Sequence, residues 1–573
     1  MNHIIFAAIL TLCPMRLYSR SGDTVFHQPL DIPVSLAASF AELRPNHFHS
    51  GIDYRTQGKT GHKVYAVADG YVSRIKVEAG GYGKALYLTH PDGHTTVYAH
   101  LDGFFDKAAT YVQNEQYARE RFPVDLFPDP ALFPVKRGQI IGISGNTGSS
   151  TGPHLHFEVR DARTEEALNP LRFVPDVTDR TPPVLQRIAV YPVGDGSMVN
   201  GVHAPLILTL EKAGRNYRVQ GNPKLTVKGE IAFGIEAYDQ ISGSTNRCGL
   251  YRLRMMIDSV TWFSQIMERI SFDENRYINS LMDYGCYMER RIKFNRMYIE
   301  PNNRLRVYDR HINRGIVSFP DSAKRLLTVE TQDFHGNVSI LNVPFVYLPA
   351  SPDAVPEWRQ LPDFKPQDYA MNVVYRRQNV KITIPANALY DNIDFRYELS
   401  PTLPGLYSEV HRIHNTRVPL HCDIMVEIAA DRLPDRLHEK ALIAQVDDKG
   451  HISSAGGAYR DHAVSAAVKT FGNYAIAADT VPPRIQPVNI PGNGNMQAYT
   501  NIRIRITDDF SGIHSYNCRI DGQWALFEYD AKKNMLIYTF TPERLTKNTR
   551  HNLHVLVTDA KGNNAEYATT FMW

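Results

Sequence analysis

Three short turn motifs recur in the same order in two distant parts of this chain, and this repetition constrains its fold more than any other feature. D-x-x-P-P is followed by D-x-x-S-G and then by D-x-x-G-N, first at 179–183, 239–243 and 333–337, and again at 479–483, 508–512 and 559–563. One such motif is an ordinary turn signature, because turns favour Asp, Gly, Pro and Ser. Three in one order indicate a single module that the chain uses twice.

Runs rich in β-branched and aromatic residues precede these turns, namely Ile231–Tyr238, Leu326–Thr331, Asn501–Ile506 and His554–Val557. Their spacing predicts β-sandwich modules of the immunoglobulin-like type. The composition agrees, since 31 Tyr and 25 Phe against 4 Trp favour pleated sheets, on which aromatic rings pack well. We therefore expect a mainly β protein.

The length of 573 residues suggests roughly four domains at ~150 residues each. We expect an N-terminal antiparallel β-sheet domain over 23–175, followed by about three β-sandwich modules. These modules are placed at 179–349, with insertions, at 371–478 and at 479–573. A Pro-rich linker is predicted over 350–370, because the segment from Pro344 to Pro366 contains six prolines, counting both ends.

The first residues predict export. Ile4–Leu12 is an apolar run of nine residues, too short to span a bilayer but typical of a secretory signal, so residues 1–22 are interpreted as a signal segment. The protein is then periplasmic or associated with the cell envelope. A positive segment before the run is missing, which leaves a buried strand of a cytosolic domain as the alternative. No other segment approaches 18 consecutive apolar residues, so no transmembrane helix is expected.

Charge and cysteines narrow the function classes. A net charge of +3 without a basic stripe argues against a nucleic-acid binder. Cys13 does not fit a lipidated Cys, because it follows a large Leu rather than the small residues typical of that site. The other four cysteines lie far apart in the sequence and form no C-x-x-C pair: Cys248, Cys286, Cys422 and Cys518. A cysteine zinc site is therefore not expected. A Cys248–Cys286 disulfide stays open, although buried inert thiols are the preferred interpretation.

The N-terminal domain alternates short β-type runs with Gly, Asp and Pro turns. Lys63–Val72 is one such run, and Lys84–His90 and His94–His100 are predicted to form a hairpin around Pro91-Asp92-Gly93. Helical periodicity is weak, except in a short helix predicted over Lys107–Arg121.

Four of the 22 histidines stand in patterns that indicate chemistry. In His154-Leu-His156-Phe-Glu158-Val159, polar and apolar residues alternate, which places His154 and His156 on one face of a half-buried strand. Two imidazoles in one groove are costly unless they share a metal or a proton-transfer task. His49 and Asp53 add an imidazole and a carboxylate four residues apart, around Gly51, which permits a tight bend.

His49, Asp53 and one of the paired histidines would supply three N/O ligands, the number found in catalytic zinc sites, where water keeps the fourth position. The absence of thiolates favours an open, hydrolytic site over a structural one. His100 closes another strand and offers a further uncoordinated imidazole. His47 and His94 fall outside these patterns and are interpreted as surface residues.

The segments HSGID, YAHL and SGNTGSSTGPHLHFEVR together resemble the lysostaphin/LytM-type zinc metallopeptidases, which cleave peptide stems or bridges of peptidoglycan. GHKVYAVADG, HPDGHTTVYAHL and KRGQIIG extend the resemblance over roughly residues 36–173. It implies a Zn²⁺ cofactor held by His49, Asp53 and His156. It also implies that His154 and His100 form the unligated catalytic pair.

Hydrolysis at zinc then gives each residue a role. The metal polarises the scissile carbonyl and lowers the pKa of its bound water toward ~7. His154 is expected to accept the proton of that water, and His100 to stabilise the oxyanion or protonate the leaving amine, although the two roles are exchangeable. The loop from Ser144 to Pro153 is either a donor of backbone hydrogen bonds to a peptide or simply a long turn.

An insert over 102–134 departs from the family, which usually has a short connection there. Its many aromatic residues argue against disorder, so we expect a folded lid or wall beside the groove. Such a wall could restrict substrates or hold the site closed until a partner acts.

The function predicted from these motifs is a zinc metalloendopeptidase that hydrolyses peptidoglycan crosslinks or stems through a metal-activated water. The main alternative is a non-catalytic or autoinhibited envelope protein that regulates other cell-wall hydrolases. Two further readings are a metalloprotease of proteins or bacteriocins and an envelope scaffold. The C-terminal β modules are expected to position the enzyme, or to bind an envelope protein partner.

Overall fold

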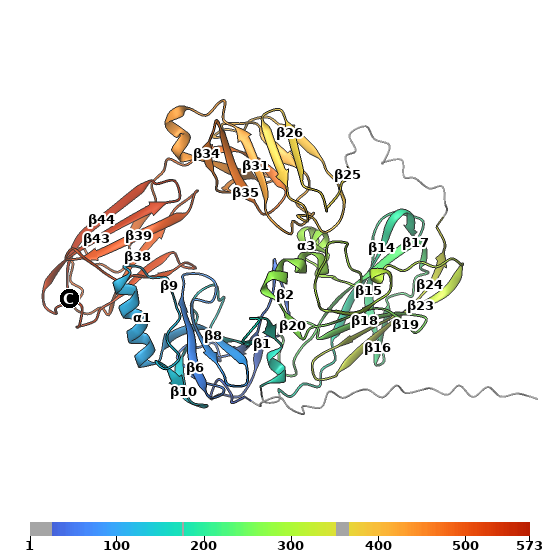
Figure 1. Cartoon of the computed structure of the whole chain (residues 1–573), viewed down its shortest axis with the longest axis horizontal. Coiled ribbons are helices and arrows are strands. Elements are labelled where there is room, and N and C mark those ends of the chain that lie inside the picture. Colours follow the sequence, from blue (N-terminus) through green and yellow to red (C-terminus); the bar gives the residue numbers. More distant parts are fainter. Residues whose placement is uncertain (1–25, 175–176, 351–365) are drawn as a thin grey trace, which may run out of the picture.

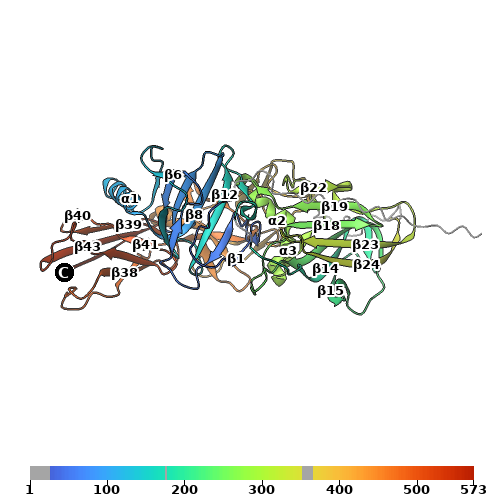
Figure 2. The same ribbon diagram turned by 90° about the horizontal axis from the view of Figure 1, so that it is seen from below.

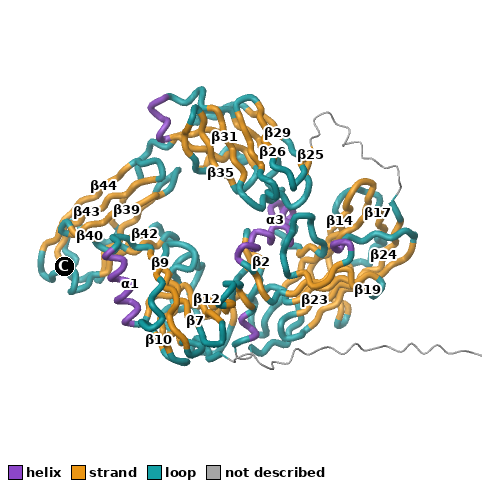
Figure 3. Tube along the Cα trace, in the orientation of Figure 1, coloured by secondary structure: helices purple, strands orange, loops and turns teal. Residues whose placement is uncertain are grey.

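The computed structural model describes residues 26–174, 177–350 and 366–573, and strands dominate them (Figure 3). The predicted mainly β class is confirmed. The predicted signal segment lies outside the described residues. Within the described ranges, no helix has the length and apolar character that crossing a membrane requires.

The N-terminal domain is built on one large sheet with the strand order β1-β4-β12-β8-β7-β6-β10. Strands β5, β9, β11 and β13 pair beside this path, and β2 and β3 form a separate pair. The bounds are β1 (Leu36–Ala38), β2 (Leu43–Arg44), β3 (His47–Phe48), β4 (Ile52–Arg55), β5 (Lys63–Tyr65), β6 (Gly70–Val77), β7 (Lys84–Thr89), β8 (His94–Phe104), β9 (Val124–Leu126), β10 (Pro134–Val135), β11 (Ile140–Ser144), β12 (His154–Asp161) and β13 (Ala167–Leu168).

Alternation along β12 explains how this sheet carries a site. Leu155, Phe157 and Val159 are fully buried in the domain core, and the intervening polar side chains lie on the opposite face. The predicted hairpin is present as β7 and β8. The prediction of one β-type run over Lys63–Val72 is wrong, because the structure has two strands there, β5 and β6. In the loop between them, the Asp69 carboxylate accepts the backbone N–H of Arg137.

The insert over 102–134 is folded. It contains helix α1 (Asp106–Ala118), near the predicted helix, and its Ala108 and Val112 join the domain core. Strands β9 and β10, which follow α1, both pair with β6, two strands from β8. These strands therefore lie at the margin of the sheet away from β4 and β12, and not beside the predicted groove as expected.

The second group of strands forms one continuous sheet in the order β21-β17-β14-β15-β16-β24-β23-β18-β19-β22, in which β24 also pairs with β17. Besides α1, two helices and three 3-10 turns are described in the first two groups: α2 (Ile278–Leu281), α3 (Tyr284–Arg290), η1 (Pro170–Arg172), η2 (Phe272–Tyr277) and η3 (Asn313–Gly315). Its strands are β14 (Val184–Val199), β15 (Leu206–Ala213), β16 (Asn216–Val219), β17 (Thr226–Tyr238), β18 (Arg252–Ile257), β19 (Val260–Ile266), β21 (Asn295–Arg296), β22 (Tyr308–His311), β23 (Ala323–Gln332) and β24 (Val338–Leu348). The short strand β20 (Arg269–Ile270) follows β19 along the chain but pairs with β13 of the N-terminal sheet.

The third group is sandwich-like, with two five-stranded sheets around a common core. One sheet contains β26 (Val373–Arg377), β27 (Val380–Ile384), β31 (Ile424–Ala429), β35 (Ala463–Val468) and β34 (Ala458–Arg460). The other contains β29 (Tyr397–Ser400), β30 (Val410–Ile413), β36 (Gly472–Ala478), β32 (Ala441–Val446) and β33 (Ile452–Ser454), with η5 (Asp435–Lys440) leading into β32. Part of the predicted linker is structured, because β25 (Pro366–Gln367) pairs with β28 (Ile393–Asp394).

The fourth group has two four-stranded sheets around its own core. They contain β37 (Arg484–Pro487), β38 (Asn501–Thr507), β42 (Met535–Thr539) and β41 (Glu528–Asp530), and β40 (Gln523–Trp524), β39 (Ile513–Ile520), β43 (Arg550–Asp559) and β44 (Asn564–Met572).

The four groups follow one another around a ring, and the last returns to the first (Figure 1). Viewed from below, the second and fourth groups lie at opposite ends with the N-terminal domain between them (Figure 2). One contact illustrates each junction. Strand β13 of the first group pairs with β20, and Tyr277 of the second group stacks on His421 of the third, with 4.2 Å between the ring centroids. Lys440 Nζ of the third group donates to the Lys561 carbonyl of the fourth at 2.8 Å, and the ring of Trp524 in the fourth group lies 5.2 Å from the Tyr117 ring of α1. The C-terminal region is thus packed against the N-terminal domain.

Candidate metal centre

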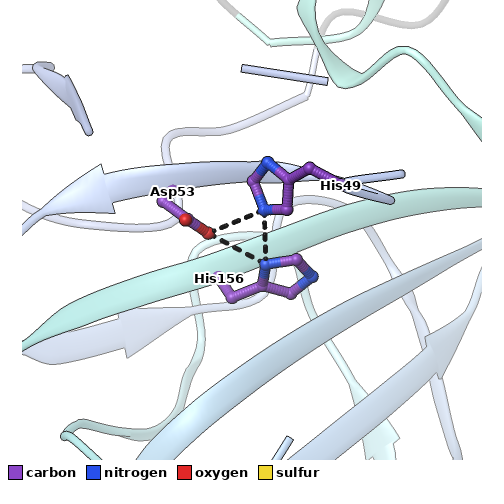
Figure 4. A group of neighbouring side chains, drawn as sticks. All are labelled: His49, Asp53 and His156. Atoms are coloured by element: carbon purple, nitrogen blue, oxygen red, sulfur yellow. Dashed lines mark hydrogen bonds and ion pairs between the residues drawn. The ribbon is translucent and has the colours of Figure 1, made fainter. Parts of the chain in front are cut away.

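Two adjacent strands and the segment before them bring the predicted ligands together. His156 on β12 lies directly opposite Asp53 on β4, and His49 lies in the segment that leads into β4. All three residues are buried. Their ligand atoms lie within 4.8 Å of one another, so this group could hold a metal ion. Figure 4 shows the carboxylate and both rings converging on one another.

The distances within this group indicate what it can bind. His49 Nε2 lies 3.0 Å from both Asp53 Oδ1 and His156 Nδ1, and His156 Nδ1 lies 2.9 Å from Asp53 Oδ1. The remaining nitrogen of His49, Nδ1, lies 2.7 Å from the carbonyl oxygen of Ser39. Because a carbonyl can only accept, this Nδ1 carries a proton.

The second ring nitrogen of His156 is fixed in the same way, since Nε2 lies 2.8 Å from Glu158 Oε1. In their neutral forms, both imidazoles therefore direct lone pairs toward each other and toward the Asp53 carboxylate. Three acceptors this close repel one another unless a cation lies among them. Two nitrogens and one carboxylate oxygen, each oriented by an outer hydrogen bond, fit Zn²⁺.

The protonation of the metal-free group follows the same logic. Burial lowers the pKa of His49, and Asp53 only partly opposes this. Burial also disfavours charge on His156, but the hydrogen bonds that its ring donates to Asp53 and Glu158, and the charges of these carboxylates, outweigh burial and raise the pKa of His156 to about 9. The same histidines hold the pKa of Asp53 well below its usual value despite burial. A proton on His156 therefore supplies positive charge when no metal does.

Glu158 anchors His156 to a buried network. This fully buried carboxylate accepts from Ser50 Oγ at 2.5 Å, from the Tyr82 hydroxyl, and from Arg160 Nε at 2.7 Å. The Arg160 charge and these hydrogen bonds hold the pKa of Glu158 below its usual value, against the effect of burial. A carboxylate that stays ionised fixes the His156 tautomer and increases the basicity of its Nδ1.

His100 reaches this face of the sheet through an irregular backbone. Ala99 lies opposite His156, so regular alternation would turn the next residue toward the core. Instead, His100 has a φ of 60° beside a register shift between β7 and β8, a left-handed conformation that is unusual for a non-glycine residue. Its ring centroid lies 4.8 Å from that of His154 and 5.8 Å from that of His156.

Both proposed catalytic histidines are held by backbone carbonyls. His100 Nδ1 donates to the Thr147 carbonyl at 2.9 Å, and His154 Nδ1 donates to the Gly152 carbonyl at 2.8 Å. In its neutral form, each ring therefore presents Nε2 as an acceptor, and Nε2 of His154 lies 3.5 Å from Asp53 Oδ1. Burial and the nearby histidines lower the pKa of His100 to about 3, which keeps it neutral.

The loop from Ser144 to Pro153 contacts the C-terminal region as well as the histidines. Lys532 Nζ donates to the Asn146 carbonyl, next to the Thr147 carbonyl that holds His100. At the adjacent edge, Lys84 Nζ lies 3.0 Å from Glu528. The fourth group of strands is thus fastened directly to a loop of the candidate site.

The remaining predicted residues are placed as follows. Gly51 has no left-handed φ; its importance is close packing, since a Cβ there would lie 2.2 Å from the Phe157 carbonyl oxygen. His47 is exposed as predicted, but His94 is half-buried, with its ring 4.8 Å from that of Phe173. The four cysteines of the described residues are free thiols, without a Cys248–Cys286 disulfide, and Cys286 and Cys422 are only half-buried.

Sequence reasoning missed the residues that hold the ligands in place. Glu158 and Arg160 continue the same period-two face as His154 and His156, and this alternation was the signal that could have identified them. Arg44, which donates to Asp53 Oδ2 at 3.0 Å, carried no local signal.

Two imidazoles and one carboxylate that converge on an antiparallel sheet, with two further histidines beside them, are the kind of donor set that metallopeptidase sites use. The family model of peptidase family M23 matches residues 47–117 and 133–170, and a Zu5-like domain matches 366–479. The gap at 118–132 falls within the insert. Through its N-terminal domain, the chain belongs to peptidase family M23, and the predicted resemblance is confirmed at this level.

Three relatives illustrate the similarity. DD-carboxypeptidase/endopeptidase Mpg of Neisseria meningitidis is 37% identical over 112 residues, covering 20% of each chain. Peptidoglycan DD-endopeptidase ShyB of Vibrio cholerae is 34% identical over 113 residues, covering 19% of this chain and 20% of ShyB. Lipoprotein NlpD of Yersinia enterocolitica is 31% identical over 118 residues, covering 21% of this chain and 95% of NlpD. The chain thus spans only about a fifth of the length of Mpg and ShyB.

Proposed function

We propose that this chain is an exported, zinc-dependent endopeptidase that hydrolyses peptide crosslinks or stems of peptidoglycan in the cell envelope. The observation that carries the proposal is the convergence of three acceptor atoms, on His49, Asp53 and His156, at 2.9–3.0 Å from one another. The name of the ShyB relative supports the peptidoglycan substrate, and the name of the Mpg relative supports an endopeptidase activity. Export is proposed from the same relatives and from the apolar run near the start of the sequence.

His49, Asp53 and His156 would hold the zinc ion, which when bound lowers the pKa of water and polarises a carbonyl. His154, the most accessible of the group with its side chain 16% exposed, is proposed to accept the proton of the attacking water at Nε2. His100, neutral and fixed through Nδ1, would receive at its own Nε2 the proton that His154 has taken from the water, and would pass it to the leaving amine, which leaves both imidazoles neutral again. The carbonyls of Thr147 and Gly152 keep the two rings in these orientations.

Digestion of purified sacculi tests this function. The full chain should release soluble fragments with new amino and carboxyl termini, identified by mass spectrometry, and a chelator should stop the release. His154→Ala should fold and bind zinc yet release far less product. His47→Ala, an exposed histidine outside the group, should behave like the unmodified chain. Equal release with and without chelator, or by His154→Ala, would refute the proposal.

A second candidate is an autoinhibited form of the same enzyme, and it rests on the contacts of the C-terminal region with the loop over Ser144–Pro153. Lys532 donates to Asn146, and Lys84 is paired with Glu528. If these contacts restrict access, Lys532→Ala should increase the rate of sacculus digestion. An unchanged or lower rate would favour a purely structural contact. An envelope protein partner bound by the C-terminal modules remains a prediction.

A further inference from the structure

The two copies of the repeated turn motifs assemble in the same way. In the first copy, Asp179 Oδ1 accepts the backbone N–H of Ser242 at 3.0 Å, and Asn337 Nδ2 donates to the Asp179 carbonyl at 3.2 Å. In the second copy, Asp479 Oδ2 accepts the N–H of Ser511 at 3.0 Å, and Asn563 Nδ2 donates to the Asp479 carbonyl at 3.0 Å. Each assembly therefore brings the three motif aspartates into one cluster of negative charge.

The copies differ at the third position of D-x-x-G-N. In the second copy this position is Lys561, whose ammonium donates to the Gly457 carbonyl and interacts electrostatically with Asp479 and Asp559. The first copy has His335 in its place. A permanent cation near the cluster is thus replaced by an imidazole, which carries no permanent charge and can bind a metal ion.

The first cluster is buried, and His335 supplies no permanent positive charge to balance its three aspartates. Asp179, Asp239 and Asp333 are 7%, 6% and 1% exposed. Asp179 Oδ2 and Asp239 Oδ1 have no hydrogen-bond partner within the described part of the chain. Buried carboxylates that repel one another are costly unless a proton or a cation compensates them.

The geometry offers a place for that cation. Ligand atoms of Asp179, Asp333 and His335 lie within 4.8 Å of one another. Asp239 is outside this trio, but its free carboxylate oxygen is buried and its charge couples to both aspartates. His335 is half-buried, which leaves the cluster open to solvent on one side.

We propose that Asp179, Asp333 and His335 bind a divalent transition-metal ion, with Asp239 contributing its negative charge. A mixed carboxylate and imidazole set suits Zn²⁺ or Mn²⁺ better than Ca²⁺ or Mg²⁺, which prefer oxygen ligands alone. Ligand atoms of Asp479, Asp508 and Asp559 in the second cluster also lie within 4.8 Å of one another, but Lys561 places a positive charge near them, so we expect no ion there. This site is distinct from the centre at His49, and it does not depend on the proposed peptidase activity.

The location of the site indicates its effect. Ile241 of the D-x-x-S-G turn belongs to the core of the N-terminal domain, and Phe334 of the D-x-x-G-N turn packs against that core. An ion held by Asp179 and Asp333 would therefore tie the start of the second group of strands to the peptidase domain. Its role is to stiffen the junction between them.

Zinc counting on the full chain tests the proposal. Protein is equilibrated with buffered free Zn²⁺, and bound zinc is measured by inductively coupled plasma mass spectrometry. His335→Lys, which copies the arrangement at Lys561 and should therefore fold, is expected to bind one zinc ion fewer than the unmodified chain. His335→Gln should show the same loss. Asp508→Asn, in the second copy, should show none.

The two metal sites can be separated in the same experiment. His156→Ala should lose its own zinc ion while the difference made by His335→Lys persists in that background. If the peptidase-site proposal alone failed, His156→Ala would lose nothing and the His335 effect would remain. Equal zinc in His335→Lys and the unmodified chain, with both folded by circular dichroism, would overturn the inference, as would an equal loss in Asp508→Asn.

Discussion

The pH dependence of zinc affinity should depend on Glu158. Zinc must displace the proton of His156, whose pKa in the metal-free site is about 9. His49, whose pKa is lowered, and Asp53, whose pKa lies well below its usual value, carry no proton on their ligand atoms at neutral pH, although His49 keeps the proton on Nδ1. Below pH 9, apparent affinity should therefore fall about tenfold for each unit of pH, which amounts to about 100-fold between pH 9 and pH 7.

Glu158→Gln keeps the shape of the side chain and removes its charge. The charge and hydrogen bond of Glu158 help raise the pKa of His156, so this pKa should fall in the variant. Protons then compete less strongly with zinc for His156, and the apparent zinc affinity should change by less than tenfold per pH unit between pH 7 and pH 9. At pH 9, where competition matters least, the loss of an outer partner should lower affinity about 10- to 100-fold, or ~1.4–2.7 kcal/mol.

The assay is competition with a chromophoric chelator at pH 7, 8 and 9. The variant also leaves Arg160, which is 5% exposed, without its main partner, at a cost on the order of 3 kcal/mol in the free energy of unfolding. Glu165→Gln is the matched control, because Glu165 contacts the same guanidinium at 3.3 Å from an exposed position. Equal pH slopes in Glu158→Gln and the unmodified chain would refute the reasoning, as would equal losses in the two variants.

Two further changes test the packing that supports the site. Gly51→Ala would place a Cβ 2.2 Å from a backbone carbonyl oxygen, so it should lower both the melting temperature and the zinc affinity. Gly152→Ala, whose Cβ would have no atom within 4 Å, should change neither. Equal melting temperatures for the two variants would contradict this explanation. Tyr117→Ala removes the ring contact with Trp524 and should open the ring of domains, raising the radius of gyration in small-angle X-ray scattering. Tyr499→Ala, an exposed tyrosine of the same C-terminal region, should leave it unchanged, and an identical profile for both variants would count against ring closure through α1.

Local pattern predicted much of the fold because it records which face of each strand is buried. The alternation from His154 to Val159 identified both the strand and the side that carries chemistry, and Pro91-Asp92-Gly93 identified the hairpin. The division of Lys63–Val72 was missed because Asp69 is committed to a contact with Arg137, far along the chain. Such contacts leave no periodic signal.

The sequence predicted the metal-ligand residues of the candidate site, but not the backbone conformation and packing that position the rest of it. His49, Asp53 and His156 were found from motif spacing and resemblance, and the structure brings them together. The position of His100 depends on a left-handed backbone within a strand, which no propensity indicates. The packing of Tyr117 against the C-terminal region joins segments about 400 residues apart and follows only from the closed ring of domains.

The most direct test of the assignment measures zinc content and sacculus digestion together, because this distinguishes a metal ligand, His156, from the general base, His154. His156→Ala should lose the zinc ion of the peptidase centre and all activity, because it removes Nδ1 from the converging acceptors. His154→Ala should keep that ion while its rate of sacculus digestion falls about 10²- to 10⁴-fold, the usual contribution of a general base. If His154→Ala lost the zinc ion, or if His156→Ala kept it, the assignment of ligands and catalytic base would be contradicted.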